Sequence, residues 1–228
     1  MGTVTAGAII DKAAKQLTDI AGVRWTRAEL LAWLNDGQRQ IVLIQPSATN
    51  TVTAVQLAAG ARQLIPSDGW LLLGINCNMG TDGATPGRAV RLISRELLDN
   101  FDPDWRTATA SAVTKNYLYD VQDQLAFHVY PPSTGTNFLQ INYSRQPANL
   151  TSESQTIEIF DVYQGALLDY MMYRACAKDA EYAPGVALSR TYAEAFAAGV
   201  GGKETSELKN TPTLELLPRN PSLPGSES

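Results

Sequence analysis

The sequence predicts an α+β fold, in which terminal α-helical hairpins pack as a bundle with an inserted antiparallel β-rich subdomain and an extended C-terminal tail. Three observations predict this class. Apolar residues recur at spacings of three and four near both ends of the 228-residue chain, as in amphipathic helices. Apolar and polar residues alternate in the middle, as in half-buried strands. After Gly202, four of the chain's twelve prolines occur without either period, which is typical of an extended segment.

The same patterns predict the domain boundaries. We expect residues 1–48 and 156–202 to form the helical bundle, because a single amphipathic helix is only marginally stable in water and needs a partner for its apolar face. Residues 49–155 are expected to form the β-rich region, with a short helix near residues 94–100. Residues 203–228 are expected to form an extended or disordered C-terminal arm.

The first two helices are expected over Thr5–Ile20 and from Thr26 onward. Gly22 is expected to end the first helix, whose apolar stripe consists of Ile9, Ala13, Leu17 and Ile20. In the second helix, Thr26 and Glu29 have the spacing of a capping box, in which each side chain accepts from the other residue's backbone N–H. Pro46 is expected to end this helix. Its apolar face consists of Leu30, Trp33, Leu34, Ile41 and Ile44, and we expect Trp33 to be buried between the helices.

The β-rich region is expected to be an antiparallel sheet or a small sandwich. Thr51–Leu57 and Arg62–Pro66 are expected to pair as a hairpin that turns at Gly60. Three further strands are expected in the segments NYLYDV, LAFHVYPP and FLQINYSR. Ser94 is expected to cap the short helix RELLD, which the segment NFDPDW ends because proline disfavours helix in the residue before it.

Helices are expected again after Thr156. The segment DVYQGALLDYMMYRACAKDAEY has Asp161 as its expected N-cap, and PGVALSRTYAEAFAAGV forms the next helix. The first of these segments presents the stripe Tyr163, Ala166, Tyr170, Tyr173 and Ala177. The second presents Leu188, Tyr192, Ala195 and Phe196.

Composition argues against several classes of protein. The formal net charge is −5 and the chain has no run of Lys and Arg, so the electrostatic signature of a nucleic-acid-binding protein is missing. The strongest apolar run, Trp70–Ile75, is far too short to cross a membrane, and the N-terminus lacks the pattern of a signal peptide. Cys77 and Cys176 are expected to remain reduced thiols. We therefore expect a soluble protein that is made in a cytoplasm.

Candidate catalytic and metal sites are weak, and we predict no catalytic residue, no cofactor and no metal. His128 is the only histidine, and its place within a predicted strand indicates a residue of the sheet face. Asp99, Asp102 and Asp104 lack the central glycine and the twelfth-position Glu of a calcium loop, and Pro103 interrupts them. These aspartates are better explained as residues that mark the end of the short predicted helix.

The glycine-rich segment MGTDGATPGR at residues 79–88 could suggest a phosphate loop. It lacks the Lys-Ser/Thr pair of a P-loop and the spacing of a dinucleotide site, so it predicts a tight excursion between extended segments. Asp120 and Asp123 could suggest a pair of glycosidase carboxylates. Acidic residues in turns are usually solvated, so this interpretation is weak.

Four segments in order resemble a known family: AGAIIDKAAKQLTDIAGVRWTRAELLAWLNDGQRQIVLIQP, NMGTDGATPGRAVRLISRELLDNFDPDW, FHVYPP and ALLDYMMYRACAKDAEY. Together they resemble the head-to-tail connector, or adaptor, proteins of tailed phages, which are related to the tail tubular protein A of short-tailed phages. The resemblance covers about residues 5–200. The Pro-rich tail departs from the family core.

This resemblance implies a structural virion protein of the phage neck, made in the host cytoplasm, that is not an enzyme and needs no cofactor. Family members form a homo-oligomeric ring, typically a dodecamer, between the portal protein and the tail nozzle or tail tube protein. DNA passes through the lumen without sequence-specific binding, and no membrane is involved. An acidic or neutral lumen would let DNA slide, which agrees with the net charge.

The resemblance also suggests which residues make contacts. The segment from Cys77 to Trp105 would contact a neighbouring subunit or a tail protein. The candidate contacts are Arg88, Arg91, Arg95, Glu96 and Trp105, although a solvated charged face explains the charges equally well from the sequence. In the tail, three leucines in an otherwise polar segment would dock on the portal or a neighbouring subunit as an arm, and a disordered end without a docking role is the alternative. These leucines are Leu214, Leu216 and Leu217.

Two other functions remain open from the sequence. A tail-associated module that binds a receptor or a glycan would need an exposed aromatic platform, for which Tyr117, Tyr119 and Tyr130 are candidates. A cell-wall hydrolase would need two carboxylates at catalytic separation in a cleft. The helical termini disfavour the first function, and the lack of convergent polar residues disfavours the second.

Overall fold

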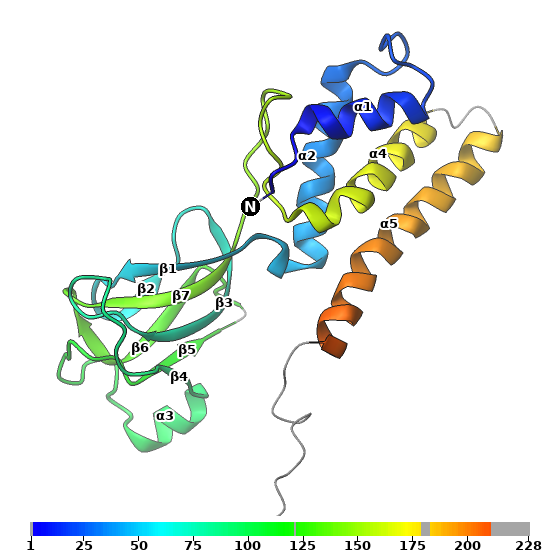
Figure 1. Cartoon of the computed structure of the whole chain (residues 1–228). Helices are drawn as coiled ribbons and strands as arrows, with labels where there is room; N and C mark the ends of the chain where they lie inside the picture. Colours follow the sequence, from blue (N-terminus) through cyan, green and yellow to red (C-terminus); the bar gives the residue numbers. More distant parts are fainter. Residues whose placement is uncertain (1, 121, 179–182, 211–228) are drawn as a thin grey trace, which may run out of the picture.

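The structure is a computed structural model that describes residues 2–120, 122–178 and 183–210. It has two parts at opposite ends of an elongated molecule (Figure 1). The helical part contains α1 (Ala6–Gln16), α2 (Arg27–Ile44), α4 (Gln164–Lys178) and α5 (Ala183–Asn210). The β part contains the strands β1 to β7 of the described residues and α3 (Arg95–Phe101). The α+β class is therefore as predicted.

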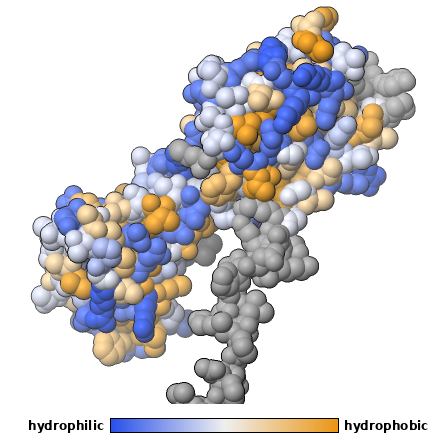
Figure 2. Space-filling model, in the orientation of Figure 1, coloured by the Kyte–Doolittle hydropathy of each residue, from blue (hydrophilic) through white to orange (hydrophobic). Residues whose placement is uncertain are grey.

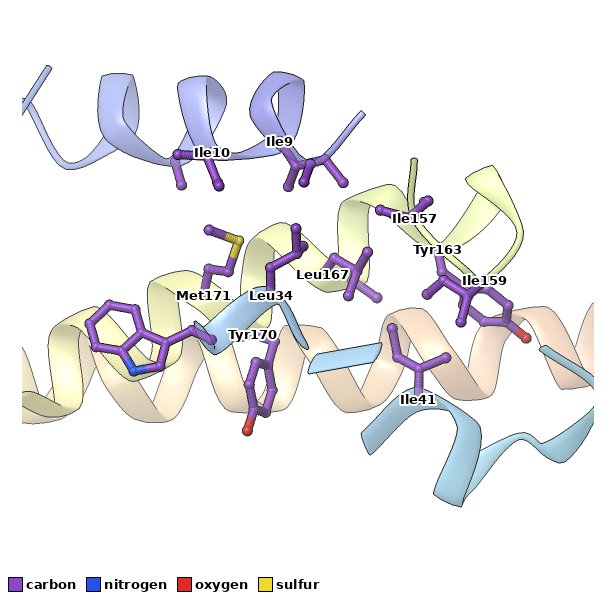
Figure 3. Packing of buried hydrophobic residues seen from close by; sticks show 14 of the residues in the cluster. Ile9, Ile10, Leu34, Ile41, Ile157, Ile159, Tyr163, Leu167, Tyr170 and Met171 are labelled. Atoms are coloured by element: carbon purple, nitrogen blue, oxygen red, sulfur yellow. The ribbon is translucent and has the colours of Figure 1, made fainter. Parts of the chain in front are cut away.

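The four helices of the helical part share one buried cluster (Figure 3). Its members come from both ends of the chain, because Ile9 and Leu34 lie in α1 and α2 whereas Leu167 and Val200 lie in α4 and α5. Trp33 also belongs to the cluster and is only 7% exposed, which confirms the predicted burial. The spacing of three and four residues on each helix thus reflects contact with the other helices.

The strands form two sheets. One contains β1 (Asn50–Gln56), β7 (Phe138–Arg145) and β3 (Gly69–Asn78), and β7 lies between the other two. The other has the order β2 (Ala59–Leu64), β6 (Ala126–Thr134), β5 (Asn116–Tyr119) and β4 (Arg91–Leu92). All named pairs are antiparallel except β4 with β5. Residues from both sheets form one cluster, so the sheets pack face to face across a shared core.

Helix α3 covers the other face of the four-stranded sheet. Tyr117 of β5 belongs to the core between the sheets, whereas the next residue, Leu118, packs with Leu98 of α3 and with Trp105. Successive residues of a strand point to opposite faces, so α3 and Trp105 lie on the outer side of this sheet. The Ser94 hydroxyl accepts a hydrogen bond from the N–H of Leu97, which confirms the predicted cap of α3.

Segments that are distant in the sequence hold the two parts together. Gln38 of α2 is fully buried, and its Oε1 accepts a hydrogen bond of 2.7 Å from the N–H of Glu158. The Glu158 carboxylate pairs with Arg145 of β7. On the β side, the Thr49 hydroxyl donates to the carbonyl of Arg145 over 2.6 Å. Both side chains of the Arg145–Glu158 pair are about one-fifth exposed, so this pair is largely shielded from solvent.

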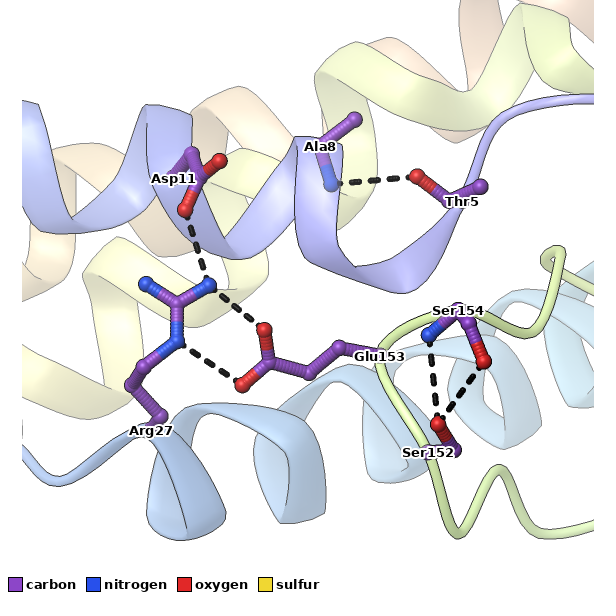
Figure 4. A network of polar contacts seen from close by, with 7 residues as sticks. All are labelled: Thr5, Ala8, Asp11, Arg27, Ser152, Glu153 and Ser154. Carbon is purple, nitrogen blue, oxygen red and sulfur yellow. Dashed lines mark hydrogen bonds and ion pairs between the residues drawn. The ribbon is translucent and has the colours of Figure 1, made fainter.

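A polar network fastens α1 and α2 to the segment after β7 (Figure 4). Arg27 of α2 donates two hydrogen bonds to the Glu153 carboxylate, of 2.8 Å and 2.6 Å, and one of 2.8 Å to Asp11 of α1. The hydrogen bonds to Glu153 and Asp11 raise the pKa of Arg27. The paired guanidinium in turn lowers the pKa of Glu153.

Only one of the two hydrogen bonds of the predicted capping box forms at the start of α2. The Thr26 hydroxyl accepts from the N–H of Glu29, as expected. The Glu29 carboxylate instead accepts two hydrogen bonds of 2.8 Å from Lys178 at the end of α4. Packing of α2 against α4 thus gives this carboxylate a cation as its partner, which forms a stronger hydrogen bond than an amide does.

The first helix is shorter than predicted. It ends at Gln16, because Thr18 has φ 55° and breaks the helical path. The Asp19 carboxylate then accepts from the N–H groups of Val23, Arg24 and Trp25 and so organises the loop before α2. Ile20, which the periodicity placed on the buried stripe, is 73% exposed.

The predicted β-hairpin at Gly60 is wrong. β1 pairs with β7 and β2 pairs with β6, so these consecutive strands belong to different sheets. The side chain of Gln63, which is 3% exposed, accepts from the N–H of Ala58 and donates to the carbonyls of Ala58 and Gly60. This buried amide satisfies the backbone where the chain crosses between sheets, and no sequence pattern predicted it.

Three predictions about the C-terminal helices are also corrected. Asp161 is not the N-cap of α4, because its carboxylate accepts from the backbone and hydroxyl of Thr3 and the N–H of Val4. α5 continues to Asn210, so the arm cannot begin at residue 203. The segment KETSELK after Gly202 contains mostly good helix formers, which sustain the helix although the apolar period has stopped. Leu188 of the predicted α5 face is 50% exposed.

Candidate functional site

The glycine-rich segment folds back onto the end of β3. Asn78, which is 5% exposed, is the centre of this arrangement. Its side-chain amide donates to the carbonyls of Arg88 and Thr114, both over 2.8 Å, and its Oδ1 accepts from the N–H of Thr114 over 2.9 Å. One buried amide therefore joins β3, the end of the loop and the segment before β5.

The tip of the loop is closed by Asp82. Its carboxylate accepts from the N–H groups of Ala84 and Thr85 over 3.0 and 3.1 Å, and from the Thr85 hydroxyl over 2.7 Å. These bonds, that of Ala84 first, lower the pKa of Asp82 to about 2. Gly80 and Gly83 have φ of 64° and 70°, which few other residues adopt. The N–H groups that would hold a phosphate are thus already bonded to an anion, which agrees with the prediction of a tight excursion.

The structure places the candidate charged contacts after this loop. Arg88, Arg91, Arg95 and Glu96 are all exposed. Arg95 and Asp99 form an ion pair of 3.5 Å along α3. Because β4 leads directly into α3, Arg91 and Arg95 lie near the same edge of the β part. Their role in subunit contacts stays a prediction.

Trp105 does not belong with the exposed contacts, because it is 1% exposed. The hydrogen bond from its N–H to the carbonyl of Asp102 folds the chain back onto the sheet after α3. The Trp105 indole donates to Asp99 over 2.7 Å, and the Arg106 guanidinium stacks 4.2 Å from the ring. Trp105 therefore anchors α3 to the sheet, and its role as a partner contact stays a prediction.

A hollow of about 570 Å³ lies beside Trp105 on the outer face of the four-stranded sheet. His128 lies at its edge, with its ring edge-on to Trp105 at a centroid distance of 5.6 Å. Burial, and then the positive charges of Arg106 and Arg62, lower the pKa of His128. The imidazole is therefore neutral at pH 7 and serves as a packing residue, as its place within the strand predicted.

The residues considered for glycan binding and for hydrolysis make contacts within the fold. Tyr117 is 9% exposed and belongs to the core between the sheets, so it cannot form an exposed platform. The hydroxyls of Tyr119 and Tyr130 donate to the Gln124 carbonyl and the Asp102 carboxylate. Asp123 pairs with Arg62 at 3.0 Å. These contacts weaken both the glycan-binding and the hydrolase hypotheses.

In residues 2–120, 122–178 and 183–210, no group of three or more His, Cys, Asp and Glu side chains is placed to hold a metal ion. Within the same residues, every helix is too short or too polar to cross a bilayer. Asp99 and Asp102, which could have suggested calcium, accept hydrogen bonds from Trp105 and Tyr130.

Sequence reasoning missed a second hollow, which we call the junction groove. It lies where the helical and β parts meet and has a volume of about 270 Å³. It is lined by Arg39, Val42, Leu43, Trp70, Gln146 and Pro147. The lining comes from three separate segments, so no local pattern could reveal it. The available signal was Leu43, an apolar residue next to the predicted buried face of α2, which is 64% exposed.

The predicted docking leucines, Leu214, Leu216 and Leu217, lie outside the described residues. Their role stays a prediction. The last described residue, Asn210, ends α5.

Comparison with known proteins gives one family. A family model described as SU10 adaptor protein matches residues 4–214, which is most of the chain. No curated protein matches the sequence.

Proposed function

Because the chain belongs to the SU10 adaptor protein family, which consists of structural phage proteins, we propose that it forms a ring in the neck of the virion. The ring, a dodecamer, joins the portal protein to the tail nozzle or tail tube protein. DNA passes through its lumen. The observation that carries the proposal is the family match over residues 4–214.

The geometry supports a structural role in assembly. The candidate catalytic side chains are used in folding: His128 packs on Trp105, and Asp123 pairs with Arg62. Exposed apolar side chains occur on several elements, including Leu97 and Phe101 of α3 and Leu43 beside the junction groove, where they are available for contact between macromolecules. An assembly protein needs such surfaces more than it needs a reactive pocket.

The net charge of −5 supports passive passage of DNA. Protein that neutralises phosphates with Lys and Arg holds DNA through the release of counterions, and this chain has more acidic than basic residues. We therefore propose that the lumen binds DNA weakly and without sequence preference.

The test is assembly with the portal protein of the same phage. Purified portal and this protein are mixed and examined by sedimentation and by electron microscopy. We expect cosedimentation and a second ring stacked on the portal, even if the free protein is a monomer, since the portal can act as the template. The matched control is a portal from an unrelated phage, which should bind no ring. Failure to cosediment with the cognate portal in any buffer would overturn the proposal.

A further inference from the structure

Strand β1 forms an open edge of the three-stranded sheet, because it pairs with β7 on one side only. The register between β1 and β7 continues without a shift over all seven residues of β1. Just beyond β1, the N–H of Leu57 donates to the carbonyl of Asn137 over 3.0 Å. Residues of an antiparallel strand face the paired strand alternately. The backbone N–H and C=O groups of Val52, Ala54 and Gln56 therefore point to the open side.

β1 lacks the features that usually protect an edge strand, namely charged side chains, proline and bulges. Its sequence, NTVTAVQ, contains neither a charge nor a proline. The other edge strands of the described residues differ from it. β2 contains Arg62 and a register shift, β3 shifts its register three times, and β4 is only two residues long. β1 is thus the edge on which an added strand can form an uninterrupted set of hydrogen bonds.

The surface of the β part also favours a contact through the backbone. On the face shown in Figure 2, hydrophobic residues of this part are mixed with hydrophilic ones and form no single large patch. Val52 of β1 is 50% exposed, and Val55 is half-buried against the core between the sheets. A strand added here would obtain affinity from its backbone hydrogen bonds and specificity from side chains at alternate positions.

The chain itself contains a segment that suits this edge. The tail as a whole follows no period, but residues 213–217, TLELL, lie between two prolines. Leu214 and Leu216 alternate with Glu215, so an extended backbone places both leucines on one face. Proline disfavours helix in the residue before it, and the two prolines limit the segment to five residues. A strand of five residues fits within the seven residues of β1.

The position of α5 indicates which copy donates this segment. Only two residues separate Asn210, the end of α5, from Thr213. The length of the chain therefore keeps the start of the segment within about 11 Å of the end of α5. Figure 1 shows the end of α5 well apart from β1. The β1 strand that receives the segment thus belongs to a second copy.

We propose that residues 213–217 of one copy add to β1 of a neighbouring copy as a fourth strand of the sheet. The open-side backbone groups of Val52, Ala54 and Gln56 pair with alternate residues of the added strand. Its two alternating leucines lie on the side of Val55 and extend the core between the sheets. Donor and acceptor are different surfaces, and such head-to-tail contacts produce a ring when the rotation between copies closes. This inference rests on the proposed ring and identifies the surface that receives the arm.

Photochemical cross-linking tests the contact. A photoreactive residue replaces Val52, and the variant is assembled on the portal and irradiated. We expect it to label residues 213–217, which mass spectrometry of the digested ring identifies. The matched control carries the photoreactive residue in place of Leu73, which is 38% exposed on β3 at the opposite edge of the same sheet. This control should not label residues 213–217. Both variants are also irradiated as concentrated free protein, so that weak self-association is detected.

Isotope labelling shows which copy donates the segment. The photoreactive chain is prepared with natural isotopes and mixed with wild-type chain that contains heavy nitrogen. Cross-links from the light β1 to the heavy residues 213–217 are expected, because the donor is a neighbouring copy. Cross-links confined to the light residues 213–217 would show that the arm folds onto its own chain, and this result would overturn the inference.

Proline substitutions test the backbone hydrogen bonds. Alternate residues of the added strand face β1, so either Glu215→Pro or Leu216→Pro removes an N–H that the contact uses. The affected variant should need at least about a tenfold higher protein concentration for association between copies. Glu227→Pro and Leu223→Pro make the same changes outside the segment, and these matched controls should associate like the wild type. Thermal melting verifies that all four variants keep the fold.

The outcomes separate the contact from the proposed function, because portal binding is measured independently by sedimentation. Rings on the portal without labelling of residues 213–217, or normal association of both proline variants in the segment, would overturn the contact and leave the adaptor function intact. Labelling of a neighbouring copy in free protein that never binds the portal would support the contact and overturn the portal role. Labelling of the portal from position 52 would identify a different occupant. That result, or the absence of labelling in every condition, overturns the inference.

Discussion

Trp33 shows how one side chain can connect most of the helical part. It lies on α2, belongs to the cluster shared by four helices, and is 7% exposed. Its edge lines a hollow together with Arg174 and Lys178 near the end of α4. A large side chain in this position fills space that no neighbouring residue can occupy without moving a helix.

We therefore expect Trp33→Ala to lower the free energy of unfolding by about 3–5 kcal/mol. The loss combines the buried indole surface with the cavity that remains. Urea denaturation measures it. Leu43→Ala on the same helix is the matched control and should change the stability little, because Leu43 is 64% exposed. Equal stability of Trp33→Ala and wild type would show that the helices do not depend on this side chain.

Several carboxylates make stability depend on pH in the acidic range. Backbone N–H groups, that of Trp25 first, lower the pKa of Asp19. The pKa of Asp161 is lowered through its hydrogen bonds with Thr3, and that of Glu153 through those with Arg27. A carboxylate whose pKa is lower in the folded state stabilises the fold above its unfolded pKa, and this stabilisation is lost as the pH falls through the folded pKa.

For Asp82, this loss of stability is expected between pH 3.8, its ordinary pKa, and about pH 2, its pKa in the folded protein. We expect the melting temperature of the wild type to fall across this window. Asp82→Asn should reduce the slope, because the amide oxygen still accepts hydrogen bonds but does not titrate. Asp104→Asn, at another exposed position in the β part, is the matched control. The slope is measured by thermal melting at intervals from pH 5 to pH 2, and equal slopes for Asp82→Asn and wild type would contradict the expectation.

At the level of elements, α5 contributes to the core, and we expect the segment after it to bind a partner. Phe196 and Val200 of α5 are buried against the other helices, so this portion is part of the core. The helix continues ten residues beyond Val200 to Asn210. At about 1.5 Å per residue, this places Asn210 roughly 15 Å along the helix from Val200. We propose that the residues beyond Asn210 act as a docking arm.

Removal of residues 211–228 tests the arm. We expect the truncated protein to melt at the wild-type temperature, because it keeps Phe196 and Val200, which α5 contributes to the buried cluster. It should lose portal binding or form a less stable ring. A full-length variant with Leu214, Leu216 and Leu217 replaced by Ser serves as the matched protein, since it keeps the length of the arm and should show the same loss. Normal assembly by both variants would indicate a spacer.

At the scale of the whole molecule, the central question is how two separately packed parts keep a fixed relationship. The Arg145–Glu158 ion pair joins β7 to the segment before α4, and Gln38 of α2 binds the backbone of the same Glu158. Trp70 of β3 packs against the helical cluster from the β side. These contacts connect the helical part to the β part.

A double-mutant cycle of Arg145→Gln and Glu158→Gln measures this connection. We expect a coupling energy within the range of about 0.5–3 kcal/mol, because the two groups are in contact and largely shielded from water. The control cycle uses Arg62 and Asp123, whose side chains are 56% and 50% exposed. That pair should show about 0.2–1 kcal/mol. A weaker coupling for Arg145 and Glu158 than for the exposed pair would contradict a supporting role at the junction.

The sequence alone was sufficient for features that depend on neighbouring residues. Side-chain caps at Thr26 and Ser94, the burial of Trp33 and the strands around His128 follow from local spacing and hydrogen-bonding chemistry. The four ordered segments were also sufficient to identify the family, because their order and spacing are specific as a set.

Only the tertiary structure decided which distant segments meet. A strand's alternation shows that one face is buried but does not name its partner, so β1 and β2 were wrongly paired with each other. The burial of Trp105 depends on α3 folding onto the outer face of a sheet, which no local pattern predicts. The junction groove arises from α2, β3 and the segment after β7. Long-range packing closes these sites, and a local pattern carries no information about residues a hundred positions away.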